Sequence, residues 1–154
     1  MRIRKARPED AKEITQLVRD TIKKVNAADY TEEQIRAWAP TNKTNKYEQM
    51  IQEGRKIWVA VEDSEIVGMA TLKTHKNEVG GFYIKHNRIG TGIGKKLNER
   101  IEKEAKKEGI NELKLWSTTT AALFYQKRGY KKIRNSYVEM NNVKVPVVIM
   151  KKKL

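Results

Sequence analysis

Residues 86–97, HNRIGTGIGKKL, place three glycines on alternate positions directly before two lysines and a helix-like run. Glycine-rich turns that open a helix often bind phosphate, because backbone N–H groups and the helix dipole both favour an anion. Glycine suits this use because a side chain would prevent close approach of the backbone. The stretch therefore indicates a phosphate site, although the glycines could equally serve a tight strand-to-helix turn with close packing.

Two common nucleotide-binding patterns do not fit this turn. A Walker A loop requires a glycine where Ile89 stands and a serine or threonine where Lys96 stands. A dinucleotide fingerprint requires Gly-x-Gly-x-x-Gly and an acid at the end of the next strand. Here Gly90, Gly92 and Gly94 are spaced differently, and the next strand ends in LKLWS without an acid. A strand end followed by such a turn would suit an extended ligand with amides and phosphates, such as coenzyme A.

Composition limits the chemistry further. The 154 residues suffice for one domain with a single core, and we expect that domain to span residues 1–154. The absence of cysteine excludes disulfides, thiolate metal sites and a cysteine nucleophile, and no metal site is expected. The net charge of +14 attracts polyanions, but lysines spread over helix-like stretches favour a solvated surface over a dedicated nucleic-acid site. No apolar stretch suits a membrane span or a signal peptide, so we expect a cytoplasmic protein.

The elements that must position the turn follow from hydrophobic periodicity. Period-two patterns predict strands at residues 2–6, 56–63, 65–74, 78–85, 112–117, 130–140 and 143–153. Period-3.6 patterns predict helical segments at about residues 8–25, 31–39, 46–54, 92–108 and 119–129. The expected fold is α+β (mixed α/β), with a central, mostly antiparallel sheet of about seven strands flanked by about four helices. Pro146 indicates that part of the last strand lies at a sheet edge.

Two blocks of the chain resemble one family. FYIKHNRIGTGIGKKL is similar to the acetyl-CoA-binding segment of the GNAT superfamily of N-acetyltransferases, Gln/Arg-x-x-Gly-x-Gly/Ala after an apolar strand end. LFYQKRGYKKI resembles the Phe-Tyr-x-Lys-x-Gly-Phe segment after that family's fifth strand, and the element order agrees over nearly the whole chain. YTEEQIRAWAP and VEMNNVKVPVVIMKK further resemble small bacterial and archaeal acetyltransferases. The resemblance implies a GNAT-like fold and direct acetyl transfer from acetyl-CoA to a primary amine of a small molecule, peptide or protein.

The resemblance also implies how acetyl-CoA is held. The strand end would offer backbone groups to the pantetheine arm, and N–H groups of the turn would bind the pyrophosphate. The implied cofactor-binding residues are Phe82, Tyr83, Ile84, Ile89, Gly90, Thr91, Gly92, Ile93, Gly94, Lys95, Thr118 and Phe124. Three positions depart from the family pattern: Ile89 replaces Gln or Arg, His86 replaces a common proline, and Thr118 replaces an asparagine. These departures are compatible with phosphate contacts made by the backbone, and they leave the affinity open.

Two catalytic residues follow from the same resemblance. Tyr125 matches the tyrosine that protonates the departing thiolate, and the alternative is simple aromatic packing with its neighbours. Glu78 matches the catalytic glutamate of the family's histone acetyltransferases, and the alternative is an exposed strand-start glutamate. His75 is the second candidate for the general base, and a water molecule is a third. Because the chain has no cysteine, an acetyl-cysteine intermediate is excluded and direct transfer is expected.

The acceptor is the least defined partner. In the family it is shaped by the segment after the first helix, here about residues 27–40, where Tyr30, Glu33 and Trp38 are available. Tyr30 and Trp38 could equally be core aromatics, and the basic chain favours an acidic or phosphorylated acceptor. Family members are often homodimers, so a homodimer is expected here too. The alternative function is a basic nucleic-acid-binding module with a non-catalytic GNAT-like fold, although no recognisable nucleic-acid motif is present.

Overall fold

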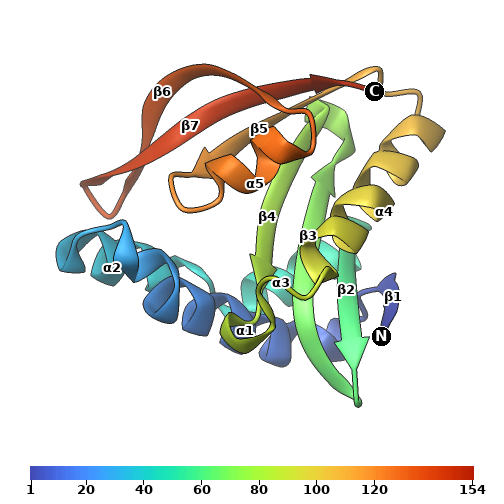
Figure 1. Cartoon of the computed structure of the whole chain (residues 1–154). Coiled ribbons are helices and arrows are strands. Elements are labelled where there is room, and N and C mark those ends of the chain that lie inside the picture. Colours follow the sequence, from blue (N-terminus) through green and yellow to red (C-terminus); the bar gives the residue numbers. More distant parts are fainter.

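The computed structural model describes residues 1–154 and contains one seven-stranded sheet with the strand order β1-β2-β3-β4-β5-β7-β6 (Figure 1). The strands are β1 (Arg2–Lys5), β2 (Lys56–Glu62), β3 (Glu65–Lys73), β4 (Glu78–Ile84), β5 (Glu112–Thr118), β6 (Lys131–Met140) and β7 (Val143–Lys153). The α-helices are α1 (Ala11–Lys24), α2 (Glu32–Trp38), α3 (Thr44–Gln52), α4 (Ile93–Lys107) and α5 (Ala122–Lys127). The predicted α+β fold is confirmed, and each of the five predicted helical segments corresponds to one α-helix, so the structure has five α-helices where about four were expected around the sheet.

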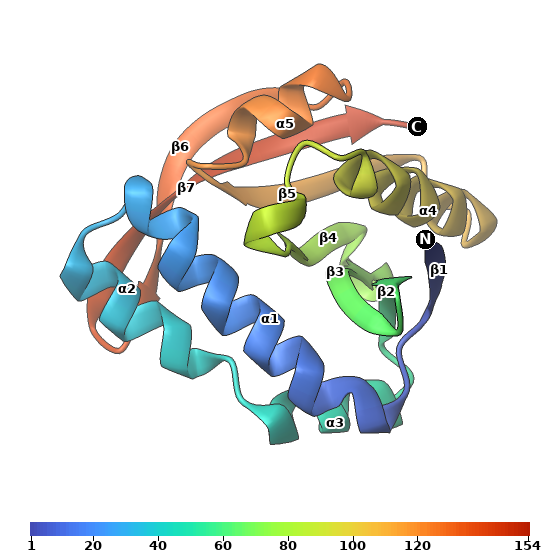
Figure 2. The same cartoon turned by 60° about the horizontal axis from the view of Figure 1, so that its bottom comes forward.

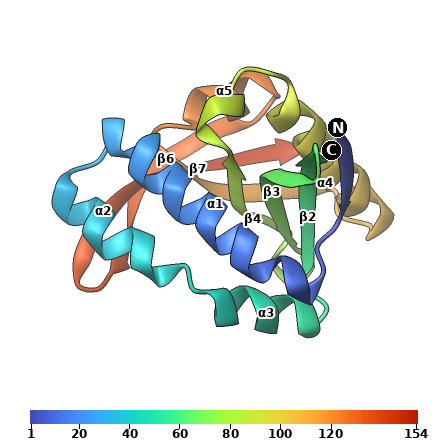
Figure 3. The same ribbon diagram turned by 90° about the horizontal axis from the view of Figure 1, so that it is seen from below.

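Helices cover both faces of the sheet. Figures 2 and 3 show α1 lying across one face beside α3, while α4 lies on the other face. The helices bury the stripes that their spacing predicts: Ile14 and Ile22 of α1 are fully buried on one face, and Leu97 and Ile101 of α4 on the other. No helix is both long enough and apolar enough to span a membrane.

Two pairs of neighbouring strands are joined by two-residue hairpin turns. Asp63 and Ser64 join β2 to β3 with φ angles of 50° and 62°. Asn141 and Asn142 join β6 to β7 with φ angles of 49° and 65°. Positive φ at both central residues matches the right-handed twist of the flanking strands, and Asp and Asn tolerate this conformation well. The hairpins therefore fix the registers of β2 with β3 and of β6 with β7.

The prediction that part of the last strand lies at a sheet edge is confirmed for residues 143–146, which have no partner on the β5 side. β7 lies between β5 and β6, and β6 is the edge strand. Pro146 is accommodated because the ladder with β5 ends one residue away, at the pair Thr118 and Val147. A proline N atom cannot donate a ladder hydrogen bond, so it lies where the neighbouring strand has already stopped.

The sheet opens between β4 and β5. These two strands form its only parallel pair, and they are paired at just two positions, Glu78 with Lys114 and Val79 with Leu115. Beyond Val79 the strands diverge, so Phe82, Tyr83 and Ile84 have a partner on the β3 side only, after an irregularity in that ladder at residues 80–81. The opening leaves backbone hydrogen-bonding groups of β4 without a strand partner, at the end where the glycine turn begins.

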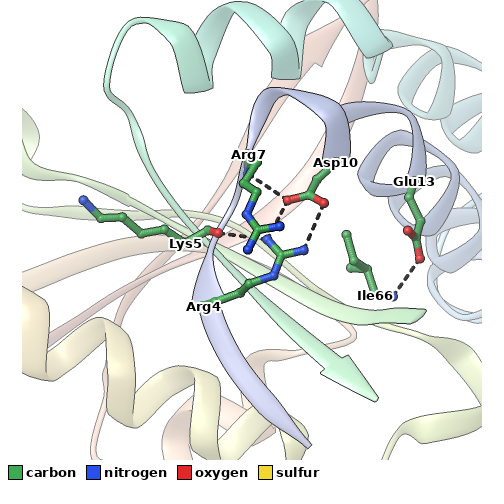
Figure 4. A network of polar contacts seen from close by, with 6 residues as sticks. All are labelled: Arg4, Lys5, Arg7, Asp10, Glu13 and Ile66. Carbon is green, nitrogen blue, oxygen red and sulfur yellow. Dashed lines mark hydrogen bonds and ion pairs between the residues drawn. The ribbon is translucent and has the colours of Figure 1, made fainter. Parts of the chain in front are cut away.

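A polar network fixes the start of α1 against the sheet (Figure 4). The Arg4 guanidinium donates two hydrogen bonds to the Asp10 carboxylate, at 2.7 and 3.1 Å, and the Arg7 backbone N–H donates a third at 2.7 Å. Burial alone would raise the pKa of Asp10, but the hydrogen bonds from Arg4 and Arg7 lower it below its ordinary value. The Ile66 N–H of β3 donates to Glu13 of α1 at 2.7 Å. The two contacts together fix the position of α1 on the β3 side of the opening.

Candidate active site

Three cavities adjoin along the open side of β4. The central cavity, of about 310 Å³, lies between the diverging strands and is lined by Glu78, Phe82, Thr118 and Tyr125, among others. The α5 cavity, of about 180 Å³, shares Phe82, Tyr83, Thr118, Ala121 and Tyr125 with the central cavity. The α3 cavity, of about 610 Å³, shares Trp38, Lys73, Gly81, Tyr83 and Met140 with the central cavity. The three cavities therefore form a row of neighbouring hollows, with the central cavity between the other two.

Strand β4 directs two sets of backbone groups into the opening. The Lys85 N–H donates to the Val67 carbonyl of β3 at 2.8 Å, so by the alternation of an antiparallel ladder the backbone of Tyr83 also faces β3. The backbone groups of Phe82 and Ile84 then face the open side, and the Ile84 carbonyl there accepts a hydrogen bond from the Thr21 hydroxyl at 3.1 Å. At the predicted strand end, the backbone groups of Phe82 and Ile84 are therefore available to a ligand on the open side. Tyr83 lines the cavities with its side chain.

The glycine turn has a geometry that glycine makes possible. Gly90 and Gly92 adopt φ angles of 82° and 91°, and a Cβ atom at either position would meet nothing within 4 Å. Gly92 is the N-cap of α4 and leaves the first amides of the helix without a side-chain cap. At Gly94 a Cβ atom would lie 2.8 Å from Cε1 of Phe124. The turn therefore combines open space over two glycines, exposed helix amides and close packing of α4 on α5.

Side chains contribute little to this turn. Ile89 is 53% exposed, and Lys95 is exposed on the first turn of α4. Arg88, one residue before the position where the family has a polar side chain, forms a 2.6 Å ion pair with Glu62 instead. The Thr91 hydroxyl donates to the Arg88 carbonyl at 2.5 Å, which is a contact within the turn. Recognition of an anion at this turn therefore falls mainly to backbone N–H groups.

Thr118 and Phe124 shape the β5–α5 side of the hollow. The Thr118 hydroxyl accepts the Ala121 N–H at 3.1 Å, and therefore stabilises the start of α5. The Phe124 ring lies between α4 and Arg128, whose guanidinium is 3.9 Å from the ring centroid. Both residues line the α5 cavity, as their prediction as cofactor-binding residues requires.

Tyr125 is at the same time a packed aromatic and a candidate acid. Its side chain is buried, with ring contacts of 5.8 Å to Phe82, 5.2 Å to Phe124 and 5.5 Å to Tyr130. Burial raises the pKa of the Tyr125 phenol, and the neighbouring Tyr130 and Tyr83 raise it further. It lines both the central and the α5 cavity, and its hydroxyl has no hydrogen-bond partner within the protein. The phenol therefore keeps its proton and has it free to donate into the hollow.

Glu78 is placed at the site and His75 is not. The Glu78 side chain is only 5% exposed and lines the central cavity, so it is not an ordinary exposed strand-start glutamate. Its carboxylate lies 3.8 Å from the Lys73 ammonium, directly across the β3–β4 ladder. His75 is exposed in the 3-10 turn between these strands and lines none of the three cavities. Of the two predicted side-chain bases, geometry favours Glu78.

The segment after α1 reaches the same hollow through two aromatic residues. The Tyr30 hydroxyl donates to the Pro146 carbonyl at 2.7 Å and accepts the Thr119 N–H at 2.9 Å. Its ring contacts Trp38 edge-on with centroids 5.4 Å apart, and both residues are buried and line the central cavity. Glu33 is exposed and lines none of the three cavities. The aromatics therefore form part of both the core and the cavity wall.

Two further residues line the α5 cavity with unpaired polar atoms. Asn26 follows α1, and its side-chain oxygen is buried without a hydrogen-bond partner. Thr120 precedes α5, and its hydroxyl oxygen is likewise buried and unpartnered. Buried polar atoms normally find partners, so these two fit a ligand with amide groups in this cavity. No sequence motif marks them, because their lack of partners follows from tertiary packing alone.

The geometry agrees with the comparison to known proteins. Residues 26–154 match the family model of the acetyltransferase (GNAT) domain. The chain belongs to the GNAT family and is an N-acetyltransferase. A curated relative, spermidine N(1)-acetyltransferase of Thermoplasma acidophilum, is 29% identical over 140 residues, covering 84% of this chain and 87% of the relative.

Two solved structures are similar over nearly the whole chain. A GCN5-related N-acetyltransferase from Rhodopseudomonas palustris has a TM-score of 0.93 and 28% identity, covering 99% of this chain and 95% of its own. The PaiA N-acetyltransferase from Thermoplasma acidophilum, in complex with coenzyme A, has a TM-score of 0.80 and 28% identity, covering 99% and 98%. The GNAT fold expected from the sequence is therefore confirmed.

Proposed function

We propose that this protein transfers the acetyl group of acetyl-CoA directly to a primary amine, with the thioester bound along the open side of β4. The observation that supports this most is the sheet opening itself, because the free backbone groups of β4 lead directly into the glycine turn of α4. The coenzyme A complex of the Thermoplasma PaiA structure supports the same ligand. The proposal treats residues 1–154 as a single N-acetyltransferase domain.

Several groups of this chain suit acetyl-CoA in an extended arrangement. The backbone groups of Phe82 and Ile84, with the unpaired side-chain atoms of Asn26 and Thr120, would bind the amides of the pantetheine arm. The amides of the residues from Gly90 to Lys95 would bind the pyrophosphate, where the glycines leave open space for it. Phe124 and Thr118 would form the adjoining wall.

Proton transfer falls to two residues that both line the central cavity, Glu78 and Tyr125. Acetyl-CoA supplies a thioester, whose carbonyl carbon forms a C–N bond with the amine as the C–S bond breaks and a thiolate leaves. Glu78 would accept the proton that the acceptor ammonium must lose, directly or through a water molecule. Tyr125 would donate its phenolic proton toward the sulfur, and its raised pKa keeps that proton in place until then.

Replacing Tyr125 by phenylalanine tests this assignment. A thiol-release assay with acetyl-CoA over a panel of amines and peptides measures kcat and KM. We expect Tyr125→Phe to lower kcat by about 100-fold, in the range of general acid catalysis, and to leave KM for acetyl-CoA unchanged. Tyr137→Phe, at an exposed tyrosine of β6, is the matched control and should have no effect. An unchanged kcat in Tyr125→Phe would remove this residue from the acid role.

The alternative function, a nucleic-acid-binding module with a non-catalytic GNAT-like fold, is not favoured, because the chain is a member of an enzyme family. A direct comparison of ligands separates the two functions. Acetyl-CoA should raise the melting temperature of the protein, while any DNA or RNA binding should be weak and lost as salt increases. Tight nucleic-acid binding without any stabilisation by acetyl-CoA would contradict the proposed acetyl transfer.

The cellular location and the oligomeric state of the enzyme are proposed as well. We place it in the cytoplasm, where acetyl-CoA is available, and we propose a homodimer. The edge strand β6 supports a dimer, because its outer backbone groups are unpaired and it exposes Ile133. Cell fractionation tests the location, and sedimentation of the purified chain tests the dimer.

A further inference from the structure

The α3 cavity has more cationic than acidic side chains in its wall. Lys46, Arg55 and Lys73 line it, and Glu53 is its only acidic lining residue. Neither Lys46 nor Arg55 forms an ion pair within the protein. Glu53 accepts a hydrogen bond from the Gln49 side chain at 3.0 Å. With Glu53 as the single acidic residue beside Lys46 and Arg55, the wall of this cavity keeps a net positive charge.

A buried amide in the same wall lacks an acceptor. Asn42 is 4% exposed, and its side-chain oxygen accepts a hydrogen bond from the Tyr47 hydroxyl at 2.7 Å. Its side-chain nitrogen is buried without a partner. Buried amide donors are normally satisfied, so this nitrogen is an independent indication of an acceptor group that binds in this cavity.

The positive cavity adjoins the reaction centre. Trp38, Gly81 and Tyr83 line both the α3 cavity and the central cavity, so the two cavities are neighbours. Lys73 also lines both cavities and lies 3.8 Å from the Glu78 carboxylate. Lys46 and Lys73 both line the α3 cavity, and burial together with the positive charge of Lys73 lowers the pKa of the Lys46 ammonium.

We infer that the acceptor is a small primary amine that also bears a carboxylate or phosphate group. This inference rests on the proposed acetyl transfer to an amine and specifies its substrate class. The amine would lie in the central cavity beside Glu78, and the anionic group would lie in the α3 cavity beside Lys46 and Arg55. At about 610 and 310 Å³, the two cavities have the size of small-molecule sites. A polyamine has no anionic group to offer and would bring further positive charge to these cations.

Matched pairs of acceptors test the inference. The thiol-release assay compares 4-aminobutanoate with its neutral amide 4-aminobutanamide, and O-phosphoethanolamine with ethanolamine. Spermidine provides the polycationic acceptor. We expect kcat/KM to be about tenfold higher for the anionic member of at least one pair, since several cations act together on one anion. The carboxylate and phosphate pairs show which anion the site prefers.

Charge-neutralising variants locate the effect. Lys46→Gln and Arg55→Gln should each raise KM for the anionic acceptor by about three- to fivefold, as expected for loss of a solvent-exposed ion pair. They should leave KM for the neutral partner unchanged. Lys43→Gln is the matched control, because it removes the same charge from an exposed residue of the same segment that does not line the cavity. It should leave KM for both acceptors unchanged.

The outcomes separate this inference from the proposed function. If kcat/KM for neutral amines or spermidine equals or exceeds that for the anionic amines, the inference of an anionic acceptor is wrong, while the proposed acetyl transfer is supported. If no amine in the panel is acetylated, the proposed function is contradicted and calorimetry with 4-aminobutanoate and O-phosphoethanolamine tests the site alone. Binding that weakens in Lys46→Gln and Arg55→Gln supports the anionic site, and absent binding overturns it.

Discussion

At the scale of single residues, Glu78 and Tyr125 occupy contrasting surroundings within one cavity. Glu78 is a buried carboxylate with a cation, Lys73, as its neighbour across the ladder. Tyr125 is buried among the aromatic rings of Phe82, Phe124 and Tyr130. An acid-base pair requires such a difference, because one group must hold a negative charge while the other must hold a proton.

Glu78→Gln tests the base. The amide has nearly the same shape but cannot accept a proton, so we expect kcat/KM at neutral pH to fall by about 100-fold or more. The loss should shrink at higher pH, where more of the acceptor amine is already deprotonated in solution. His75→Gln is the matched control, since His75 is exposed outside the cavities, and it should retain full activity. Loss of activity in His75→Gln with full activity in Glu78→Gln would reverse the assignment.

The sequence alone predicts the residues that stand in recognisable blocks. Tyr125, Phe124 and the strand end at Phe82 all line the hollow, because local spacing and the order of elements determine their place. The burial of Glu78 could not be predicted, since it depends on the divergence of β4 from β5 rather than on neighbours in the chain. The unpaired polar atoms of Asn26 could not be predicted for the same reason.

At the scale of elements, the glycine turn and α4 act as one unit. Gly92 in the left-handed conformation turns the chain into α4 and leaves its first amides uncapped. The turn was predicted because glycine spacing and the start of a strong apolar stripe are both visible in the chain. The order of the C-terminal strands in the sheet could not be predicted from the sequence. β7 lies inside the sheet because the Asn141–Asn142 hairpin places β6 on its outer side.

Gly92→Ala tests the role of this turn. At a φ of 91° an alanine is strained, and we expect a loss of about 1–2 kcal/mol in the free energy of unfolding. The added methyl group would also enter the open space above the turn, so KM for acetyl-CoA should rise by about fivefold or more, roughly 1 kcal/mol.

Gly54→Ala is the matched control for the strain. Gly54 has a φ of 80° and equally open surroundings, but it lies at the end of α3, away from the turn. Its alanine variant should lose similar stability without a change in KM for acetyl-CoA. An equal rise of KM in both variants would show that strain, and not the phosphate site, causes the effect.

At the scale of the whole molecule, buried tyrosines determine the response to alkaline pH. Tyr47, Tyr125 and Tyr130 are almost completely buried, and burial is the main cause that raises the pKa of each phenol. Above about pH 10 the unfolded chain loses these phenolic protons while the folded chain keeps them. The unfolded state then binds fewer protons, so the free energy of unfolding decreases as pH rises.

Urea unfolding between pH 9 and 11 measures this dependence. Burial is also the main cause that raises the pKa of Tyr83, and four such phenols give a limiting slope of about 5 kcal/mol per pH unit above their ordinary pKa, with little dependence below it. Tyr130→Phe should reduce the slope by about a quarter, and it breaks no hydrogen bond, because the Tyr130 hydroxyl has no partner. Tyr137→Phe on the exposed edge is the control. A free energy that stays constant through pH 11 would contradict the predicted effect of burial.

One contact described above links the two substrates of the reaction. The Tyr30 hydroxyl belongs to the acceptor segment, yet its partners are Pro146 of β7 and Thr119 of the loop that leads to Tyr125. A movement of the acceptor segment that breaks either hydrogen bond also changes the loop on the coenzyme side. If occupancy at one proposed site breaks such a bond, the resulting change in affinity is the same factor in both directions. The Tyr30 hydroxyl is thereby a hydrogen-bonding group that the two proposed substrate sites share.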